Sequence, residues 1–208
     1  MNDFHAQKRC PWVDLSKPDY VHYHDTEWGV PVHDDRKFFE FLILESAQAG
    51  LSWYTILSRR NHYRQAFAQW DPNRVARFNE DDIERLMTDC GIIRNRKKIQ
   101  AAIQNARAFL KIQETFGSFD AYIWRFVDGK PIVNTLHTMA DYPVTSPEAR
   151  ALSRDMRQRG FGFFGPIICY AHMQATGMVL DHTMDCYRRR EILQTDCIGT
   201  SSLKGNPD

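Results

Sequence analysis

The sequence predicts an all-α fold, because its periodic segments repeat apolar side chains at the three- and four-residue steps of a helix. Helix-capping residues and helix-ending glycines separate these segments, in place of the Asn-Gly turns that join strands in sheet proteins. The 208 residues are 43% hydrophobic and 25% charged, which is the composition of an ordinary globular protein. We expect one helical domain, or two interleaved lobes, over residues 1–195 and a disordered tail over 196–208.

Two helices are expected in the most apolar part of the chain. Asp34 or Asp35 can cap a helix over 38–49, and Gly50 can end it. A second helix is expected over 52–67, because it begins with a capping serine and carries large apolar residues at helical spacing. These two helices should form the centre of the core.

Capping residues mark where the next predicted helices begin. Asp71-Pro72 places a proline in the first turn of a short helix, and Asn79 can cap the helix that follows. After a basic turn over 94–98, a long helix carries one apolar stripe toward Gly117. The stripe predicts that this helix packs against the core with one face.

The second half of the chain follows the same pattern with a longer interruption. Ser118 can cap a short helix, and residues 128–145 are expected to form a proline-punctuated connection. Ser146 can cap another helix, and a glycine-rich turn over 159–166 leads into a helix over 167–176.

Charge and hydropathy restrict the function only weakly. The net charge of +1 neither indicates nor excludes a polyanionic partner, because binding responds to local fields. No stretch approaches the roughly 20 apolar residues of a membrane-spanning helix, and residues 1–5 lack the layout of a secretory signal. We expect a monomeric, cytoplasmic protein with no membrane partner, in which the five cysteines are thiols or metal ligands and not disulfides.

Cys10 and His24 near one end of the chain, and His182 and Cys186 near the other, are each half of a candidate metal site. The second pair is spaced by four positions, which places both side chains on one face if the segment is helical. A Cys2His2 set is typical of structural zinc, and here it would clip the two chain ends together. Unrelated roles for the four residues are the alternative. The competing ligands are His22, His33 and Cys197.

Glu45 is a carboxylate expected on an apolar helix face. Helical spacing puts it in line with Phe38 and Phe41, whereas Glu40 fits the solvent-facing side. A buried carboxylate needs a partner or a raised pKa. An arginine in a purely structural pair is one candidate partner, and a ligand is the other.

Aromatic residues accompany this carboxylate. Trp53 follows Glu45 by about two turns, and the N-terminal segment supplies Trp12, Tyr20 and Tyr23. An acid within an aromatic box suits a flat cationic ligand, since a cation over a ring gains roughly 0.5–2 kcal/mol. Simple core packing is the alternative for these rings.

The glycine-rich turn is a candidate DNA-binding hairpin. Glycines allow positive φ and expose backbone amides that can bind a phosphate at the start of the next helix. The nominated residues are Gly160, Phe161, Gly162, Phe163 and Gly165. No lysine lies between Gly160 and His182, which disfavours strand cleavage through a Schiff base and favours a reaction that consumes water.

Five strings of residues occur in a distinctive order along the chain. They are CPWV at 10–13, YHDTEWGVP at 23–31, QAGLSW at 48–53, GIIRNR at 91–96 and MQATG at 173–177. In these strings the chain resembles the DNA-3-methyladenine glycosylase I (Tag) family from Cys10 to about Cys186. It departs from the family pattern at Ser46, where glycine is common, and at Leu180, where asparagine is usual.

The resemblance implies the helix-hairpin-helix glycosylase fold, in which a hairpin grips damaged double-stranded DNA beside a pocket for an extruded base. It also implies a structural Zn²⁺ on the four Cys and His residues named above. The base-pocket positions of the family fall on Glu45, Tyr23 and Trp53, with Trp12 and Tyr20 as neighbours.

The implied activity is hydrolysis of the N-glycosidic bond of 3-methyladenine in alkylated DNA, the first step of base excision repair, with 3-methyladenine as the released base. Glu45 is one catalytic candidate. Asp181 is the other, although it could instead orient the adjacent zinc ligand. Two other functions stay open: a DNA-binding module without chemistry, and a thiol hydrolase that uses Cys169 and His172.

Overall fold

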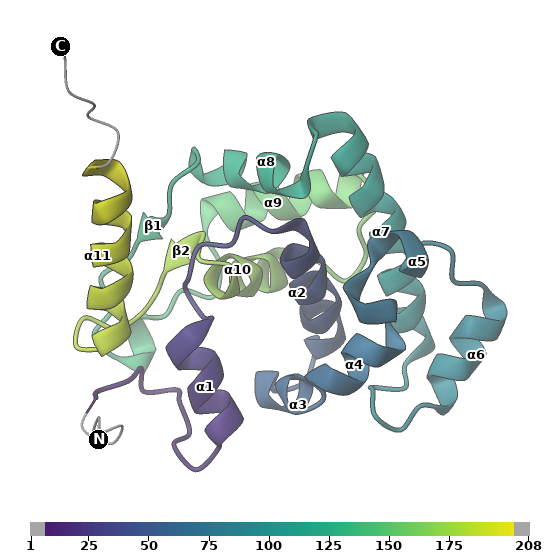
Figure 1. Cartoon of the computed structure of the whole chain (residues 1–208), viewed down its shortest axis with the longest axis horizontal. Helices are drawn as coiled ribbons and strands as arrows, with labels where there is room; N and C mark the ends of the chain where they lie inside the picture. The colour runs from purple at the N-terminus through teal and green to yellow at the C-terminus, as the bar shows by residue number, and fades with distance from the viewer. Residues whose placement is uncertain (1–6, 202–208) are drawn as a thin grey trace.

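The computed structural model describes residues 7–201, with side chains as far as residue 195, and is built mainly of helices (Figure 1). The helices of this part are α1 (Pro18–Thr26), α2 (Asp35–Gln48), α3 (Trp53–Leu57), α4 (Arg60–Ala66), α5 (Pro72–Val75), α6 (Glu80–Thr88), α7 (Arg96–Phe116), α8 (Phe119–Ile123), α9 (Pro147–Gln158), α10 (Pro166–Ala175) and α11 (Tyr187–Ser201). Two short strands, β1 (Ile132–Val133) and β2 (Val179–Leu180), accompany them. The predicted all-α fold is confirmed.

Helix α2 lies at the centre of the molecule (Figure 1). Every residue from Phe38 to Ala47 is buried, because α3, α7, α8 and α10 all pack against this helix. A helix enclosed on all sides needs apolar residues all round, which explains its run of Phe, Leu and Ile. Its start is set locally, since the Asp34 side chain accepts a hydrogen bond from the Lys37 amide at 2.7 Å.

The segment 52–67 differs from the prediction, because it forms two helices, α3 and α4, that separate around Ser58. Arg60, in the first turn of α4, pairs with Glu27 and Glu40 at 2.6 Å, so the chain bends toward α1 and α2 at this point. The same contacts correct the expectation for Glu40, which is buried and ion-paired and does not face solvent. Ion pairs between distant segments therefore account for both the separation of α3 from α4 and the burial of Glu40.

Residues 128–145 contain a strand that the sequence did not indicate. β1 pairs in parallel with β2, with Ile132 opposite Val179 and Val133 opposite Leu180. A two-residue strand carries too little alternation to be recognised from its pattern. The pairing fixes the chain directly after α10, where the segment 181–186 begins.

The N-terminal segment of the described chain lies beside the start of α11. The N-terminal segment and α11 lie on the same side of the molecule (Figure 1), and the Tyr187 amide donates to the Lys8 carbonyl at 2.9 Å. Helix α11 continues to Ser201, so residues 196–201 of the predicted tail are helical, and residues 202–208 lie outside the described residues. No helix of the described part has the length and apolar character needed to cross a membrane.

Candidate active site and metal centre

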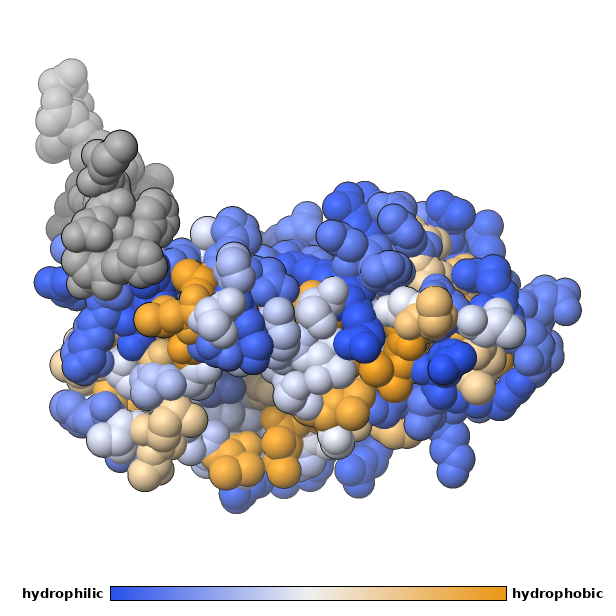
Figure 2. Space-filling model, turned by 90° about the horizontal axis from the view of Figure 1, so that it is seen from below, coloured by the Kyte–Doolittle hydropathy of each residue, from blue (hydrophilic) through white to orange (hydrophobic). Residues whose placement is uncertain are grey.

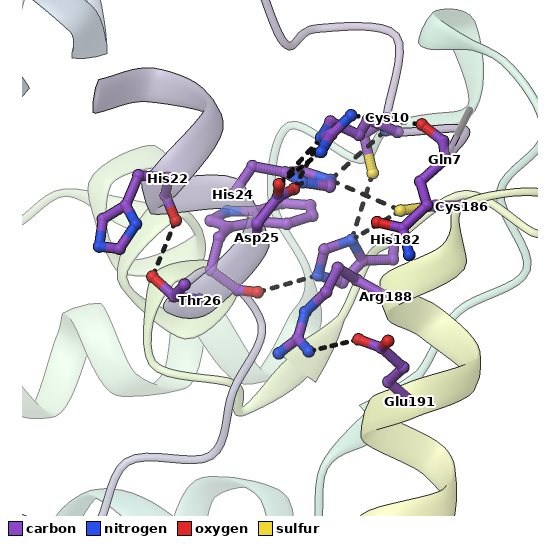
Figure 3. Close-up of polar contacts among 12 residues, drawn as sticks. Gln7, Cys10, His22, His24, Asp25, Thr26, His182, Cys186, Arg188 and Glu191 are labelled. Atoms are coloured by element: carbon purple, nitrogen blue, oxygen red, sulfur yellow. Dashed lines mark hydrogen bonds and ion pairs between the residues drawn. The ribbon is translucent and has the colours of Figure 1, made fainter. Parts of the chain in front are cut away.

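Four metal-ligating side chains from the two ends of the chain meet in the interior (Figure 3). Their ligand atoms all lie within 4.8 Å of one another, and the buried residues that supply them are Cys10, His24, His182 and Cys186. Helix α1 supplies His24, and the connection between β2 and α11 supplies His182 and Cys186. The grouping predicted from the sequence is confirmed, and the group could hold a metal ion.

The connection between β2 and α11 brings its two ligands together by a turn. The Cys186 amide donates to the Thr183 carbonyl at 2.9 Å, and Cys186 Sγ lies 3.3 Å from His182 Nδ1. The segment is not helical, so the condition for a shared helix face is not met, and the turn brings the pair together instead.

Both histidines are oriented through the ring nitrogen that faces away from the sulfur atoms. His24 Nδ1 donates to Asp25 Oδ1 at 2.7 Å, and Arg9 holds that carboxylate in turn at 2.7 Å. His182 Nε2 donates to the Trp28 carbonyl at 2.9 Å. Metal-binding histidines characteristically donate their other N–H to a carboxylate or carbonyl, so the donor set and its supports fit a metal. Four protein ligands would leave no open position, as in a structural site.

The two competing ligands within the described residues, His22 and His33, do not join this cluster. His33 Nδ1 pairs with Asp120 at 2.8 Å on the surface. His22 lies on α1 and lines a separate polar cleft beside α2 and α4. The side chain of Cys197 lies outside the described residues.

A pocket of about 290 Å³ lies next to the metal cluster. It is lined by Trp12, Tyr20, Tyr23, Trp28, Glu45, Gln48, Trp53, Met139, Tyr142, Pro143, Ala171, Gln174 and Ala175. The ring centroids of Tyr23 and Trp53 lie 5.4 Å apart at 49°, so the two rings converge on the cavity. The volume is near the lower end of the range for small-molecule sites and suits one small planar ligand. All the aromatic residues predicted for an acid-containing box are brought together here.

The surface around α1 and α3 is mixed in character. Figure 2, which views the molecule from below, shows patches of hydrophobic side chains within a mostly hydrophilic surface. Met139 lines the pocket and is 54% exposed, and Leu51, between the lining residues Gln48 and Trp53 in sequence, is 39% exposed. Apolar side chains are therefore available to meet a partner near the pocket.

Glu45 is the carboxylate of this pocket, and only 2% of it is exposed. Its partner is not an arginine, because His172 Nδ1 donates to Glu45 Oε2 at 2.7 Å. Burial raises the pKa of the Glu45 carboxyl, and the neighbouring imidazole partly offsets this rise. A strongly buried acid with a single protein partner inside a cavity is a typical feature of a functional site.

Three further polar atoms of the pocket, two indole nitrogens and the Tyr142 hydroxyl, lack a hydrogen-bond partner within the described part of the chain. Trp12 Nε1 and Trp53 Nε1 are buried, and no hydrogen-bond acceptor reaches them within the described part of the chain. Buried N–H groups are nearly always paired, so these donors are available to a ligand. The cavity therefore combines stacking surfaces, free donors and one acid.

Asp181 does not reach the pocket. It is fully buried and accepts hydrogen bonds from Asn134 Nδ2 at 2.7 Å, Tyr170 Oη at 2.8 Å and Gln174 Nε2 at 2.8 Å. Its carboxylate therefore joins the strand region to α10 and does not face a reacting group. It does not orient His182 either, since the Trp28 carbonyl does so.

The glycine-rich turn connects α9 to α10 and has two kinds of amide. Those of Gly160, Phe161 and Gly162 are already bonded to Arg157, Met156 and Asn105 respectively. Those of Phe163 and Gly165 have no acceptor within residues 7–201. Of the five nominated residues, only these two can offer amides to a phosphate.

The turn is held from behind by one buried side chain of α7. Asn105 accepts from the Gly162 amide at 2.7 Å and donates to the Gly162 carbonyl at 3.1 Å. Phe161 is buried in the core, whereas Phe163, with φ of 55°, is 41% exposed. The Phe161 side chain is therefore inaccessible to a partner, whereas the Phe163 side chain is accessible.

His172 is the main residue that sequence reasoning misassigned. The sequence suggests His172 only as a base for Cys169, but the Cys169 thiol donates to the Phe164 carbonyl at 3.6 Å, and burial strongly raises the pKa of this thiol. This geometry is wrong for a thiol hydrolase. A polar residue among apolar neighbours on the face of α10 toward α2 was the available signal. Tyr142 was also missed, because it lies in an irregular connection.

Comparison with known proteins places these features in a family. Residues 12–189 match the methyladenine glycosylase family. The chain is similar to DNA-3-methyladenine glycosylase 1 of Escherichia coli (strain K12), with 48% identity over 179 residues, covering 86% of this chain and 95% of the relative. It is also similar to a crystal structure of 3-methyladenine DNA glycosylase I (TAG), with a TM-score of 0.84, 48% identity, and coverage of 86% and 98% of the two chains. A variant of such an enzyme in complex with 3-methyladenine gives a TM-score of 0.81 at 38% identity, covering 83% and 93%.

Proposed function

The chain belongs to the methyladenine glycosylase family, and from this premise we propose that it hydrolyses the N-glycosidic bond of 3-methyladenine in alkylated double-stranded DNA. This reaction is the first step of base excision repair. The observation that carries the proposal is the buried Glu45 carboxylate, enclosed by aromatic rings in a cavity sized for a small planar molecule. Such a cavity suits a base extruded from the helix.

The pocket recognises the charge of the alkylated base. Alkylation at N3 makes the purine cationic, so Tyr23 and Trp53 gain cation–π attraction when they stack on it. Glu45 accepts a hydrogen bond from the base edge and opposes its positive charge. A neutral adenine offers neither gain, which gives selectivity for the lesion.

The same charge reduces the chemistry required of the protein. A cationic base is already a good leaving group, so no strong general acid is needed to release it. Water attacks the sugar carbon as the bond to the base breaks, the electron pair of that bond leaves with the base as neutral 3-methyladenine, and the added water loses a proton to solvent. The main tasks of the protein are to extrude the base, at a cost of about a few kcal/mol, and to hold it.

DNA is held by the turn between α9 and α10. The free amides of Phe163 and Gly165 meet a backbone phosphate at the start of α10, where the helix dipole favours negative charge. These contacts need no large positive net charge, which agrees with the value of +1. Shape and damage, and not sequence, would then determine where the protein binds.

The four Cys and His ligands would hold Zn²⁺ in a structural role. When bound, the ion supplies no chemistry to the reaction and acts as a cross-link. Its ligands adjoin the pocket, since Trp12 lies with its ring centroid 5.3 Å from that of His24 and 4.9 Å from that of Trp28. The metal centre thereby stiffens one wall of the pocket. We expect the protein to act as a cytoplasmic monomer.

The test is chromatography of bases released from methylated duplex DNA. The wild-type protein should release 3-methyladenine, and Glu45→Gln should release it at least about 100-fold more slowly while it still binds undamaged duplex. A DNA-binding module without chemistry would bind the duplex and release no base from either protein. That outcome would refute the enzymatic proposal.

A further inference from the structure

His172 and Glu45 form a buried pair across the interface between α10 and α2. Both side chains are enclosed, and the distance from His172 Nδ1 to Glu45 Oε2 is 2.7 Å. The hydrogen bond from His172 reaches Glu45 Oε2, and no hydrogen bond to Glu45 Oε1 occurs within the part of the chain that the structure describes. One oxygen of the acid is therefore held by the protein, and the other is left for a ligand.

The second ring nitrogen of His172 decides the charge of the pair. Nε2 is buried and has no partner among residues 7–201. The rings of Phe38 and Phe164 flank the imidazole at 6.0 and 5.4 Å between centroids. A proton on Nε2 would be a buried donor without an acceptor, which is costly. The proton therefore resides on Nδ1, the imidazole is neutral, and the pair carries the single negative charge of Glu45.

We propose that His172 is a positioning residue that keeps Glu45 ionised and fixes the direction of its free oxygen, so that the pocket accepts a cationic purine and rejects a neutral one. This inference rests on the proposed function and assigns part of its selectivity to a second residue. A flexible carboxylate would lose more rotational freedom on binding, and a protonated one would lose its attraction for a cation.

The other titratable groups near Glu45 do not compete for this role. Burial raises the pKa of Tyr23 on α1 well above its ordinary value, and burial likewise raises the pKa of Cys169 on α10. Both stay neutral at neutral pH. The hydrogen bond from His172 lowers the pKa of Glu45 against its burial, so the loss of that bond should raise the pKa further.

Two variants separate the hydrogen bond from packing. His172→Phe keeps a flat ring between Phe38 and Phe164 but removes the N–H, whereas His172→Asn keeps a donor near the position of Nδ1. We expect His172→Phe to weaken binding of 3,9-dimethyladeninium, a cation with a methyl group in place of the sugar, roughly tenfold or more and to narrow its preference over neutral 9-methyladenine. The acid limb of the pH profile for base release should move to higher pH. His172→Asn should restore most of the affinity and the original profile.

The result that overturns the inference is a His172→Phe protein with wild-type affinity, preference and pH profile. Equal impairment of both variants would also overturn it, because packing alone would then explain the effect. Imidazole ¹⁵N chemical shifts of the wild-type protein give a readout that needs no ligand, and a proton on Nε2 instead of Nδ1 would refute the assignment. Absence of 3-methyladenine release by the wild-type protein refutes the proposed function instead, and the ¹⁵N shifts still decide the inference.

Discussion

The metal cluster and the base pocket share a wall but treat their polar atoms in opposite ways. In the cluster, each histidine nitrogen either faces the sulfur atoms or is bonded to the protein, as His24 is to Asp25. In the pocket, Trp12 Nε1 and Trp53 Nε1 have no partner within the described chain. Saturated polar groups stabilise a fold, whereas unsatisfied ones wait for a ligand. The comparison favours a structural role for the first region and a ligand-binding role for the second.

The two regions should therefore respond differently to mutation. Damage to the cluster should appear first as lost stability, and damage to the pocket as lost binding at nearly unchanged stability. Active sites commonly sacrifice stability in this way, and the fold compensates elsewhere. The following predictions test this division, and they begin with the largest effect.

Removal of the metal or of one ligand should have the largest effect. Cys186→Ser, or a chelator, should lower the free energy of unfolding by about 4 kcal/mol or more, because it opens a cross-link between distant chain ends. This corresponds to a fall in Tm of roughly 10 °C, measurable by scanning calorimetry. Cys90→Ser is the matched control, since Cys90 is exposed. An unchanged Tm in chelator would show that the cluster does not act as a clip.

Asp181→Asn should have the next-largest effect, and, like the loss of a metal ligand, it should lower stability and leave base release almost unchanged. The carboxylate accepts three hydrogen bonds, and an amide cannot accept all of them, so we expect a loss of about 3 kcal/mol in unfolding free energy. The rate of base release per folded molecule should stay within about twofold of wild type. A fall of more than tenfold in that rate, with the fold intact, would return Asp181 to the list of catalytic groups.

Trp53→Ala should show the effect expected for the pocket, a loss of binding at nearly unchanged stability. Loss of a stacking ring should cost about 2 kcal/mol of base binding, or roughly 30-fold in affinity, with little change in Tm. Trp124→Ala is the contrasting variant, because the buried Trp124 lies outside the pocket lining, donates to the Val32 carbonyl at 2.9 Å, and should mainly lower Tm. Fluorescence titration with free 3-methyladenine and thermal melts measure the two effects. Equal Tm losses in both variants would contradict the division.

Glu45→Gln should have the smallest effect on stability, and it should raise the free energy of unfolding. Burial raises the folded-state pKa of Glu45 above its unfolded value, so the ionised form destabilises the native state at neutral pH. The variant should be about 1 kcal/mol more stable at pH 7, and its advantage should shrink as the pH falls through the folded-state pKa of Glu45. Denaturant titrations at several pH values test this, and a destabilised variant at pH 7 would contradict it.

Glu27 is a second buried carboxylate, and its pKa is shifted in the opposite direction to that of Glu45. Burial opposes its ionisation, but Arg60 and Lys37 outweigh it and lower the pKa to about 2. Its stabilisation is therefore present above the ordinary carboxyl range and is lost as the pH falls toward 2. A carboxylate that belongs to the fold and one that belongs to the site are distinguished by the direction of this shift.

Local signals in the sequence predicted the helix starts well. The capping side chains of Asp34, Ser52, Asn79 and Ser118 all accept the expected backbone amides, because a cap depends on residues within one turn. The metal ligands could also be nominated, since Cys and His in paired spacings are rare. The break between α3 and α4 could not be predicted from the sequence, and neither could the β1–β2 pair, because contacts between distant segments create both.

In the candidate site, too, contacts between distant segments could not be predicted from local sequence signals. The sequence placed Glu45 on a buried face and supplied aromatic residues to surround it, but it did not identify His172 as the partner. The pairing depends on how α10 crosses α2, and no residue spacing encodes that crossing. The free amides of the turn were likewise unpredictable, because Asn105 on α7 occupies one of the candidates.

The metal cluster also changes the connectivity of the folded chain. Cys10 and His182 are 172 positions apart, so with a metal bound almost the whole polypeptide becomes a closed ring and not an open line. A ring that is cut once, for example by a protease in the irregular segment before α9, is still held together at its joint. Circularly permuted proteins, with the original ends fused and new ends opened in that segment, should therefore still assemble around the ion.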